Sequence, residues 1–128
     1  MSLLLDTQIL LWSQSEPERL PKWLADDLDD PSQAPVFSVV SIWEIVIKTA
    51  LKRKNFDYDA QLIRSTLIEL GWNELQLSGD HVLAVNDMPL LHGDPFDRVL
   101  VAQAKVEAMQ FVTVDTALID YGSHIRLL

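Results

Sequence analysis

The chain has 128 residues, 48% of them hydrophobic, and 19 acidic against 10 basic residues give a net charge of −9. This length predicts a single domain over residues 1–128, and the apolar content excludes a disordered chain. The absence of cysteine excludes disulfides, thiolate zinc sites, iron–sulfur clusters and cysteine nucleophiles. No apolar run approaches the roughly 20 residues that span a bilayer, and the first residues do not form a signal peptide, so we expect a cytoplasmic protein.

The charges are unevenly distributed along the sequence. Half of the basic residues lie between positions 48 and 64, whereas acids gather elsewhere, notably at 26–30. Phosphate contacts in proteins come from lysine and arginine, so a basic edge can serve an anionic substrate even on an acidic protein. The rest of the protein is acidic and is suited to binding a basic partner.

Short apolar runs alternate with amphipathic helical patterns along the whole chain. We expect strands at 3–5, 36–38, 75–77, 111–114 and 124–127. We expect helices at 7–13, 21–29, 41–54, 59–70, 78–88, 95–109 and 116–121. Strands that are separated by helices imply right-handed crossovers and a parallel sheet with both faces covered. The prediction is a three-layer α/β/α fold with a central, mainly parallel sheet of four or five strands.

Four carboxylates stand where predicted strands end or helices begin. They are Asp6, Glu44, Asp97 and Asp115. Because sites in parallel sheets form at the carboxyl ends of the strands, we expect the four to converge. Oxygen ligands without cysteine favour Mg²⁺ or Mn²⁺ over zinc, and carboxylate-bound ions of this kind commonly serve phosphodiester cleavage.

Helix capping is an alternative explanation for each acid taken alone. Asp6 and Asp115 could be N-caps, and Ser41 with Glu44 has the spacing of a capping box. The run from Asp94 to Asp97 has an N-cap, a proline at the first helical position and an acid in the first turn. Capping does not explain why four acids would gather on one side of the sheet.

Four sequence blocks resemble the PIN domain of VapC-type ribonuclease toxins, which belong to bacterial and archaeal toxin–antitoxin pairs. The blocks are Leu3–Thr7 with Leu10–Trp12, Ser38–Ile45 with Lys48, His92–Arg98 with Val99–Ala104, and Val112–Asp115. They occur in the family's order and span almost the whole chain. One departure is Gln8, where relatives often carry histidine after the Asp-Thr pair.

The resemblance implies a PIN-like domain and a metal-dependent endoribonuclease that hydrolyses RNA phosphodiester bonds with metal-activated water. Asp6 and Asp97 would hold the main Mg²⁺ or Mn²⁺ ion, and Glu44 and Asp115 would complete the site. Further candidates are Thr7, Asp94 and Thr113 as supporting residues, and Lys48, Lys52, Arg53 and Arg98 as contacts to the RNA backbone. A homodimer is also implied, together with a cognate antitoxin that has a basic or amphipathic tail, and no membrane association. The alternative is a catalytically inert PIN-like protein that acts through complex formation.

Overall fold

Five parallel strands form one sheet in the computed structural model, which describes residues 2–91 and 93–128. Met1 and His92, the first residue of the third sequence block, lie outside the described residues. The strands are β1 (Leu3–Leu5), β2 (Val36–Ser38), β3 (Asn73–Leu75), β4 (Gln110–Thr113) and β5 (Ile125–Leu127), in the order β3-β2-β1-β4-β5. β1 is therefore central, with Leu4 paired to Val36 of β2 and to Phe111 of β4. The prediction of a central parallel sheet is confirmed.

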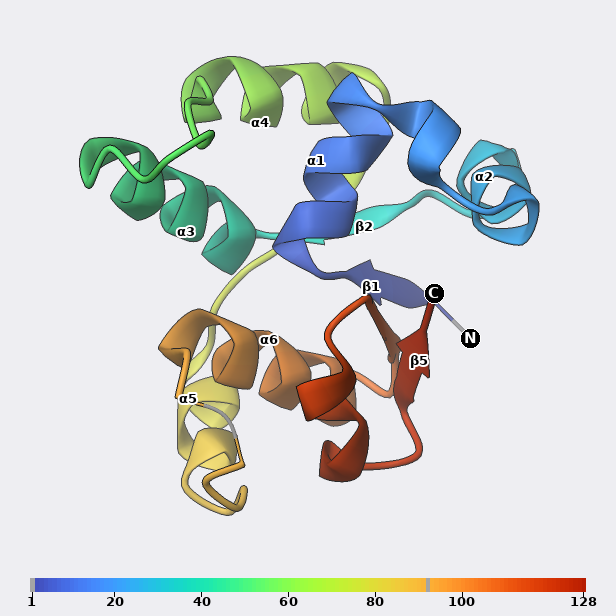
Figure 1. Ribbon diagram of the computed structural model, residues 1–128. Helices are drawn as coiled ribbons and strands as arrows, with labels where there is room; N and C mark the ends of the chain where they lie inside the picture. The colour runs from blue at the N-terminus through green and yellow to red at the C-terminus, as the bar shows by residue number, and fades with distance from the viewer. Residues whose placement is uncertain (1, 92) are drawn as a thin grey trace.

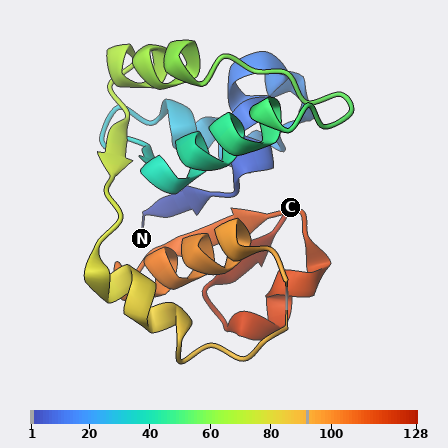
Figure 2. The ribbon, with the colours of Figure 1, turned by 90° about the vertical axis from the view of Figure 1, so that its left-hand side faces the viewer.

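Helices cover both faces of this sheet. They are α1 (Thr7–Ser15), η1 (Pro17–Arg19), α2 (Lys22–Asp29), α3 (Val39–Ala50), α4 (Ala60–Glu69), α5 (Gly79–Val85), α6 (Pro95–Val106) and η2 (Thr116–Tyr121). In Figure 1, α1, α3 and α4 lie on one side of β1 and β2, and α5 and α6 lie on the other. The view turned by 90° shows the same separation (Figure 2). The predicted α/β/α layering is confirmed. No helix among the described residues has the length and apolar character needed to cross a bilayer.

The central strand alternates its side chains between two hydrophobic cores. Leu3 and Leu5 pack into a cluster with Ile9 and Leu10 of α1. Leu4 points the opposite way and packs with Leu100 of α6. This follows from the two-residue period of a strand, and each fully buried leucine contributes about 1.5–3 kcal/mol to stability. The same alternation holds the end of β1 at the centre of the fold.

Helix α3 begins earlier than the sequence predicts and also ends earlier. It runs from Val39 to Ala50, with Ser38 as its N-cap, whose hydroxyl accepts the Val40 N–H at 3.0 Å. Ser41 is fully buried inside the first turn, so the capping-box explanation of Glu44 is wrong. Beyond the helix, Lys52 adopts a left-handed φ of 54°, which stops helical continuation. Glu44 therefore lies in the helix interior, on the face that carries Ser41.

Strand β3 also differs from the prediction by two residues. It covers Asn73–Leu75, in register with Val36–Ser38 of β2, whereas the apolar pattern favoured 75–77. β3 lies at the edge of the sheet, where polar side chains are tolerated on a strand that pairs on one side only. The apolar pattern of the sequence therefore does not reveal the position of this edge strand.

A buried glutamine ties the start of α3 to α6. Gln103 is fully buried, and its Oε1 accepts a hydrogen bond from the Ser38 hydroxyl at 2.5 Å. Its Nε2 donates to the Gln76 carbonyl oxygen at 3.3 Å. The two helices that carry Glu44 and Asp97 are thus linked beneath the site.

We expect Gln103→Leu to lower the free energy of unfolding by about 1–3 kcal/mol, because the variant leaves the buried Ser38 hydroxyl and the Gln76 carbonyl without these partners. Urea denaturation measures the loss. The matched control is Gln61→Leu on α4, since that side chain is exposed and its replacement should change stability by less than about 0.5 kcal/mol. Equal stability of the two variants would contradict the structural role of Gln103.

Candidate metal centre

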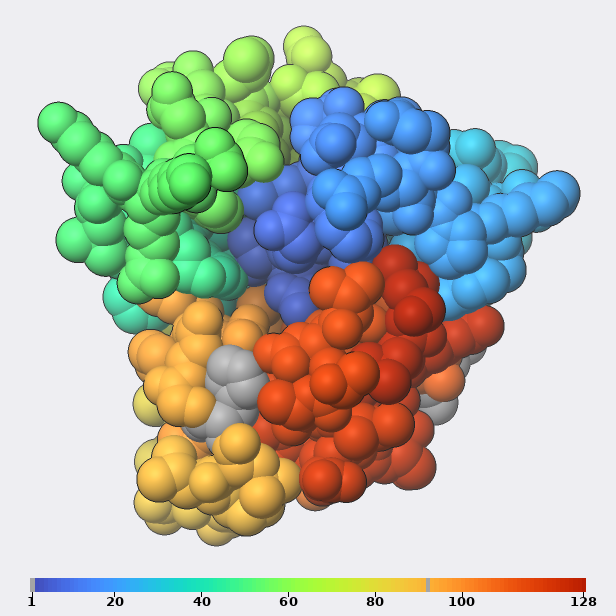
Figure 3. Space-filling view, viewed as in Figure 1, coloured from blue at the N-terminus to red at the C-terminus, as the bar shows by residue number. Residues whose placement is uncertain are grey.

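The backbone brings acids from three segments to one end of the sheet. Asp6 directly follows β1, Glu44 lies on α3, and Asp94 and Asp97 begin α6. In the space-filling view, the blue, green and orange segments that contain these residues meet on the face turned to the viewer (Figure 3). This is the carboxyl end of β1, where parallel sheets form their sites.

Three of these carboxylates form a compact group. Glu44, Asp94 and Asp97 each offer an oxygen, and these oxygens all lie within 4.8 Å of one another. Glu44 is buried and the two aspartates are half-buried. A set of carboxylate oxygens without histidine or cysteine fits a hard divalent cation such as Mg²⁺ or Mn²⁺.

Asp6 lies beside this group and does not act as a helix cap through its side chain. It occupies the N-cap position of α1 without a side-chain capping hydrogen bond. The residue is 7% exposed, and its carboxylate accepts a hydrogen bond from the Thr113 hydroxyl at 2.6 Å. Burial raises the pKa of Asp6, the Thr113 hydrogen bond partly offsets this, and the charge of Glu44 raises it further. The Thr113 hydroxyl thus contributes more to the setting of this carboxylate than the start of α1 does, although the backbone N–H groups of Thr7 and Gln8 also lower the pKa of Asp6.

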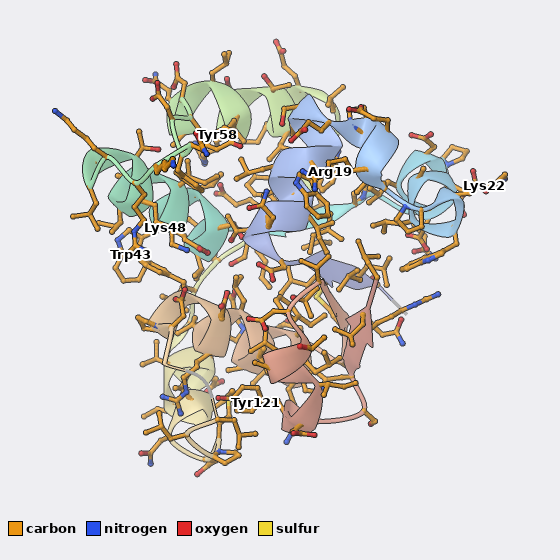
Figure 4. The ribbon with its side chains drawn as sticks, in the orientation of Figure 1. Arg19, Lys22, Trp43, Lys48, Tyr58 and Tyr121 are labelled. Atoms are coloured by element: carbon orange, nitrogen blue, oxygen red, sulfur yellow. The ribbon has the colours of Figure 1, made fainter. Side chains whose placement is uncertain are left out.

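Glu44 is held by hydrogen bonds on both carboxylate oxygens. The Thr7 hydroxyl donates to Oε1 at 2.6 Å, and the Ser41 hydroxyl lies 2.9 Å from the Thr7 oxygen. The Lys48 ammonium forms an ion pair with Oε2. Lys48 is one helical turn from Glu44, so both project from the same side of α3, as Figure 4 shows for Lys48. These contacts fix the orientation of the carboxylate.

Asp97 shows the electrostatic strain of the site most clearly. Burial raises the pKa of Asp97 to about 8, and the charges of Asp6, Asp94 and Glu44 contribute, while Lys48 acts in the opposite direction. Like charges that are crowded in a partly buried site disfavour ionisation. A divalent cation would relieve this repulsion, so the electrostatics agree with the donor set.

Asp94 and Asp115 are both helix caps, as the alternative interpretation predicted. Asp94 Oδ1 accepts the Phe96 N–H at 2.9 Å, and Asp115 Oδ1 accepts the Ala117 N–H at 2.9 Å. The Asp94 carboxylate nevertheless belongs to the compact group, whereas Asp115 does not. Asp115 is connected to the site through its N–H, which donates at 3.0 Å to the same Thr113 oxygen that binds Asp6. The structure thus gives Asp94 a more central place than the sequence suggested.

The predicted basic contacts separate into two sets. Lys48 and Arg53 line an open groove of about 420 Å³ beside the acids, together with Asp94 and Phe96. Lys52 lines an adjoining groove with Arg53. Arg98 instead donates from Nη2 to the Met88 carbonyl oxygen at 3.4 Å, so it contacts the segment that follows α5.

The sequence prediction missed Ser41 as a neighbour of the acids and did not show that Lys48 pairs with Glu44. Both follow from helical spacing, because positions 41, 44 and 48 share one face of α3. Extending the helical pattern of α3 back to Val39 would have revealed this face in the sequence. With Ser41 as the N-cap, the predicted helix begins too late for this shared face to be recognised.

We expect Thr113→Val to weaken Mn²⁺ binding about 10- to 100-fold, because Asp6 would lose the hydroxyl that orients it. Isothermal titration calorimetry measures the affinity. Thr116→Val is the control, since this exposed threonine lies on η2 and outside the network. Unchanged affinity in Thr113→Val would show that the hydroxyl has no role in the site.

Comparison with known proteins identifies the family. The family model of the PIN domain matches residues 3–123. Among solved structures, VapBC2 from Rickettsia felis bound to a promoter DNA fragment is 14% identical, with a TM-score of 0.68, over 100% of this chain and 98% of that chain. A toxin–antitoxin complex from Klebsiella pneumoniae is 17% identical, with a TM-score of 0.66, over 98% and 96% of the two chains.

A third solved structure, VapBC-1 from nontypeable Haemophilus influenzae, is 17% identical, with a TM-score of 0.64, over 100% of this chain and 97% of that chain. No curated protein matches the sequence. At these identities the solved structures establish the fold, and the family model covers nearly the entire sequence. The chain belongs to the PIN domain family.

Proposed function

We propose that this protein is a Mg²⁺- or Mn²⁺-dependent endoribonuclease and the toxin of a toxin–antitoxin pair. The observation that supports this most directly is the compact group of Glu44, Asp94 and Asp97, with buried Asp6 beside it. Further support comes from the PIN domain match and from the similar structures of VapBC and toxin–antitoxin complexes. The choice of RNA as substrate rests on the resemblance to VapC-type toxins.

In this proposal the chain supplies a preorganised anionic site. A divalent ion held by these carboxylates would supply positive charge for activating a water molecule and for stabilising charge on the phosphate. Thr7 and Thr113 orient the carboxylates of Glu44 and Asp6, which would act as ligands or neighbours of the ion. Asp97 gives up the proton that its raised pKa retains in the ion-free protein. Asp115 would complete the site from its place beside Thr113.

The basic residues of the groove would position the nucleic acid. Lys48 and Arg53 line the groove next to Asp94, so a phosphate there would lie between cations and the acidic group. Phosphate contacts of this kind hold the backbone and carry no base specificity. Lys52, in the adjoining groove, would extend the same path.

We also propose a homodimer and an antitoxin partner. In the described structure, α3 exposes several large apolar side chains, a common feature of surfaces that bind protein. They are Trp43, Val46 and Ile47, with Leu51 immediately after the helix. The net charge of −9 suits a basic antitoxin tail.

The test is cleavage of total RNA by the purified protein with Mn²⁺ and with EDTA. We expect fragments with Mn²⁺ and intact RNA with EDTA, and a matched single-stranded DNA substrate shows whether the activity requires RNA. Intact RNA under both conditions, with Mn²⁺ bound and the fold preserved by circular dichroism, would instead support an inert PIN-like protein that acts through complex formation.

A further inference from the structure

Lys48 is a cation already placed inside the acidic site. Its ammonium pairs with Glu44 Oε2 and lies 3.6 Å from Asp94 Oδ2. The Lys48 side chain is 21% exposed, and that of Glu44 is 5% exposed, so solvent screens this pair only weakly. Burial lowers the pKa of Lys48, but the hydrogen bond to Glu44 and the charges of Glu44, Asp94 and Asp97 together outweigh it, so the pKa is raised and the ammonium stays charged.

The carboxylates that bind Lys48 are the same ones that are grouped for a divalent cation. Glu44 and Asp94 contribute two of the three oxygens that lie within 4.8 Å of one another. An ammonium and a divalent cation that share these carboxylates would repel each other strongly in a partly buried site. Both cannot be held by these oxygens without an energetic cost.

We propose that Lys48 is the counter-ion of the ion-free site and that it leaves Glu44 and Asp94 when these carboxylates bind a divalent cation. This inference rests on the metal site of the proposed function, and it states that Lys48 competes with the divalent cation for the carboxylates of that site. Lysine suits the role because its ammonium is a compact charge on a flexible stem, which can move without disturbing the helix. The groove that Lys48 shares with Arg53 gives the displaced ammonium a place beside a substrate phosphate.

Lys48 has opposite effects on the protein without and with the divalent ion. Without the divalent ion, Lys48 offsets the negative charges of Glu44 and Asp94, and so it stabilises the fold. With the ion, Lys48 is an additional positive charge that opposes binding. Removal of its charge should therefore lower stability in EDTA and increase the affinity for the ion.

The test is Lys48→Met, with Lys48→Arg and Lys54→Met as controls. Lys48→Arg keeps the charge at the site, and Lys54→Met removes the same charge from an exposed position that follows the end of α3. Mn²⁺ titration by calorimetry should show about tenfold tighter binding or more for Lys48→Met. Both controls should stay within about threefold of the parent. Melting curves in EDTA should place Lys48→Met below the parent.

Equal or weaker Mn²⁺ binding by Lys48→Met would overturn the displacement of Lys48, because removal of an ammonium that competes for Glu44 and Asp94 should tighten binding. Lys48→Gln provides a second neutral side chain if the methionine variant does not fold. If the parent binds Mn²⁺ and cleaves RNA while neither neutral variant binds more tightly, only the role of Lys48 fails. If the parent does not bind Mn²⁺, the proposed function fails together with it.

Discussion

Asp97→Asn is expected to reduce Mn²⁺-dependent RNA cleavage by at least roughly a hundredfold, to background, while the circular dichroism spectrum stays unchanged. Asp97 belongs to the compact carboxylate group, and asparagine keeps the shape of the side chain but supplies no negative charge. Its position in the first turn of α6 is tolerant of asparagine, so the fold should persist. Initial cleavage rates on a defined RNA, at saturating Mn²⁺, measure the effect.

The matched control is Asp80→Asn. Asp80 is likewise an acid in the first turn of a helix, α5, and its side chain is exposed. This variant removes the same charge and the same interaction with the helix dipole, and it should cleave RNA at the parental rate. Full activity in Asp97→Asn, or equal losses in both variants, would contradict the assignment of Asp97 to the site.

The stability of the ion-free protein should fall as the pH rises from about 4 to about 8. Burial raises the pKa of Asp97 to about 8, and the neighbouring acids contribute, whereas the unfolded chain ionises near pH 4. Within that range the folded protein retains a proton that the unfolded chain has released. Raising the pH therefore favours unfolding, and the contribution of Asp97 is lost as the pH approaches its folded pKa.

Asp97→Asn isolates this effect because asparagine does not titrate. In EDTA, the free energy of unfolding of the variant minus that of the parent should increase by about 1–3 kcal/mol between about pH 5 and pH 8.5. This figure is below the full linkage value because part of the side chain is reached by solvent. Denaturant titrations at several pH values measure it. Parallel curves for parent and variant would show that Asp97 ionises normally in the folded protein.

The sheet was the most predictable part of this fold. The runs at Leu3–Leu5 and Val36–Ser38 are confirmed as strands with these exact bounds, because short, well-buried strands leave a clear apolar pattern. Asn73–Leu75 was misplaced because its register depends on pairing with β2, which a local pattern cannot show. The start of α3 was misplaced because Ser38 and Ser41 are both acceptable caps, and only burial of Ser41 distinguishes them.

Which acids lie together was predictable in part, because the sequence pattern indicated Asp115 in place of Asp94 as a member of the group, and the individual contacts were not predictable. Parallel strands and helix starts bring Asp6, Glu44 and Asp97 to one edge, and the structure places them there. The use of both Asp94 oxygens, one as a cap and the other facing Lys48, depends on side-chain geometry. The same is true of the Thr113 hydroxyl, which joins Asp6 to the backbone after β4.

Thermal melting of the parent and of Asp97→Asn, each with EDTA and with Mn²⁺, decides whether the acidic group is a divalent cation site. In EDTA the variant should melt at the same temperature as the parent or higher, because asparagine removes a carboxyl group that ionises more readily in the unfolded chain than in the folded one. At an Mn²⁺ concentration near 100 times the dissociation constant, the parent should gain about 2.7 kcal/mol and the variant much less. Equal destabilisation of Asp97→Asn in both conditions, with no effect of Mn²⁺ on the parent, would mean that Asp97 only stabilises the start of α6. The acidic group would then not be a divalent cation site.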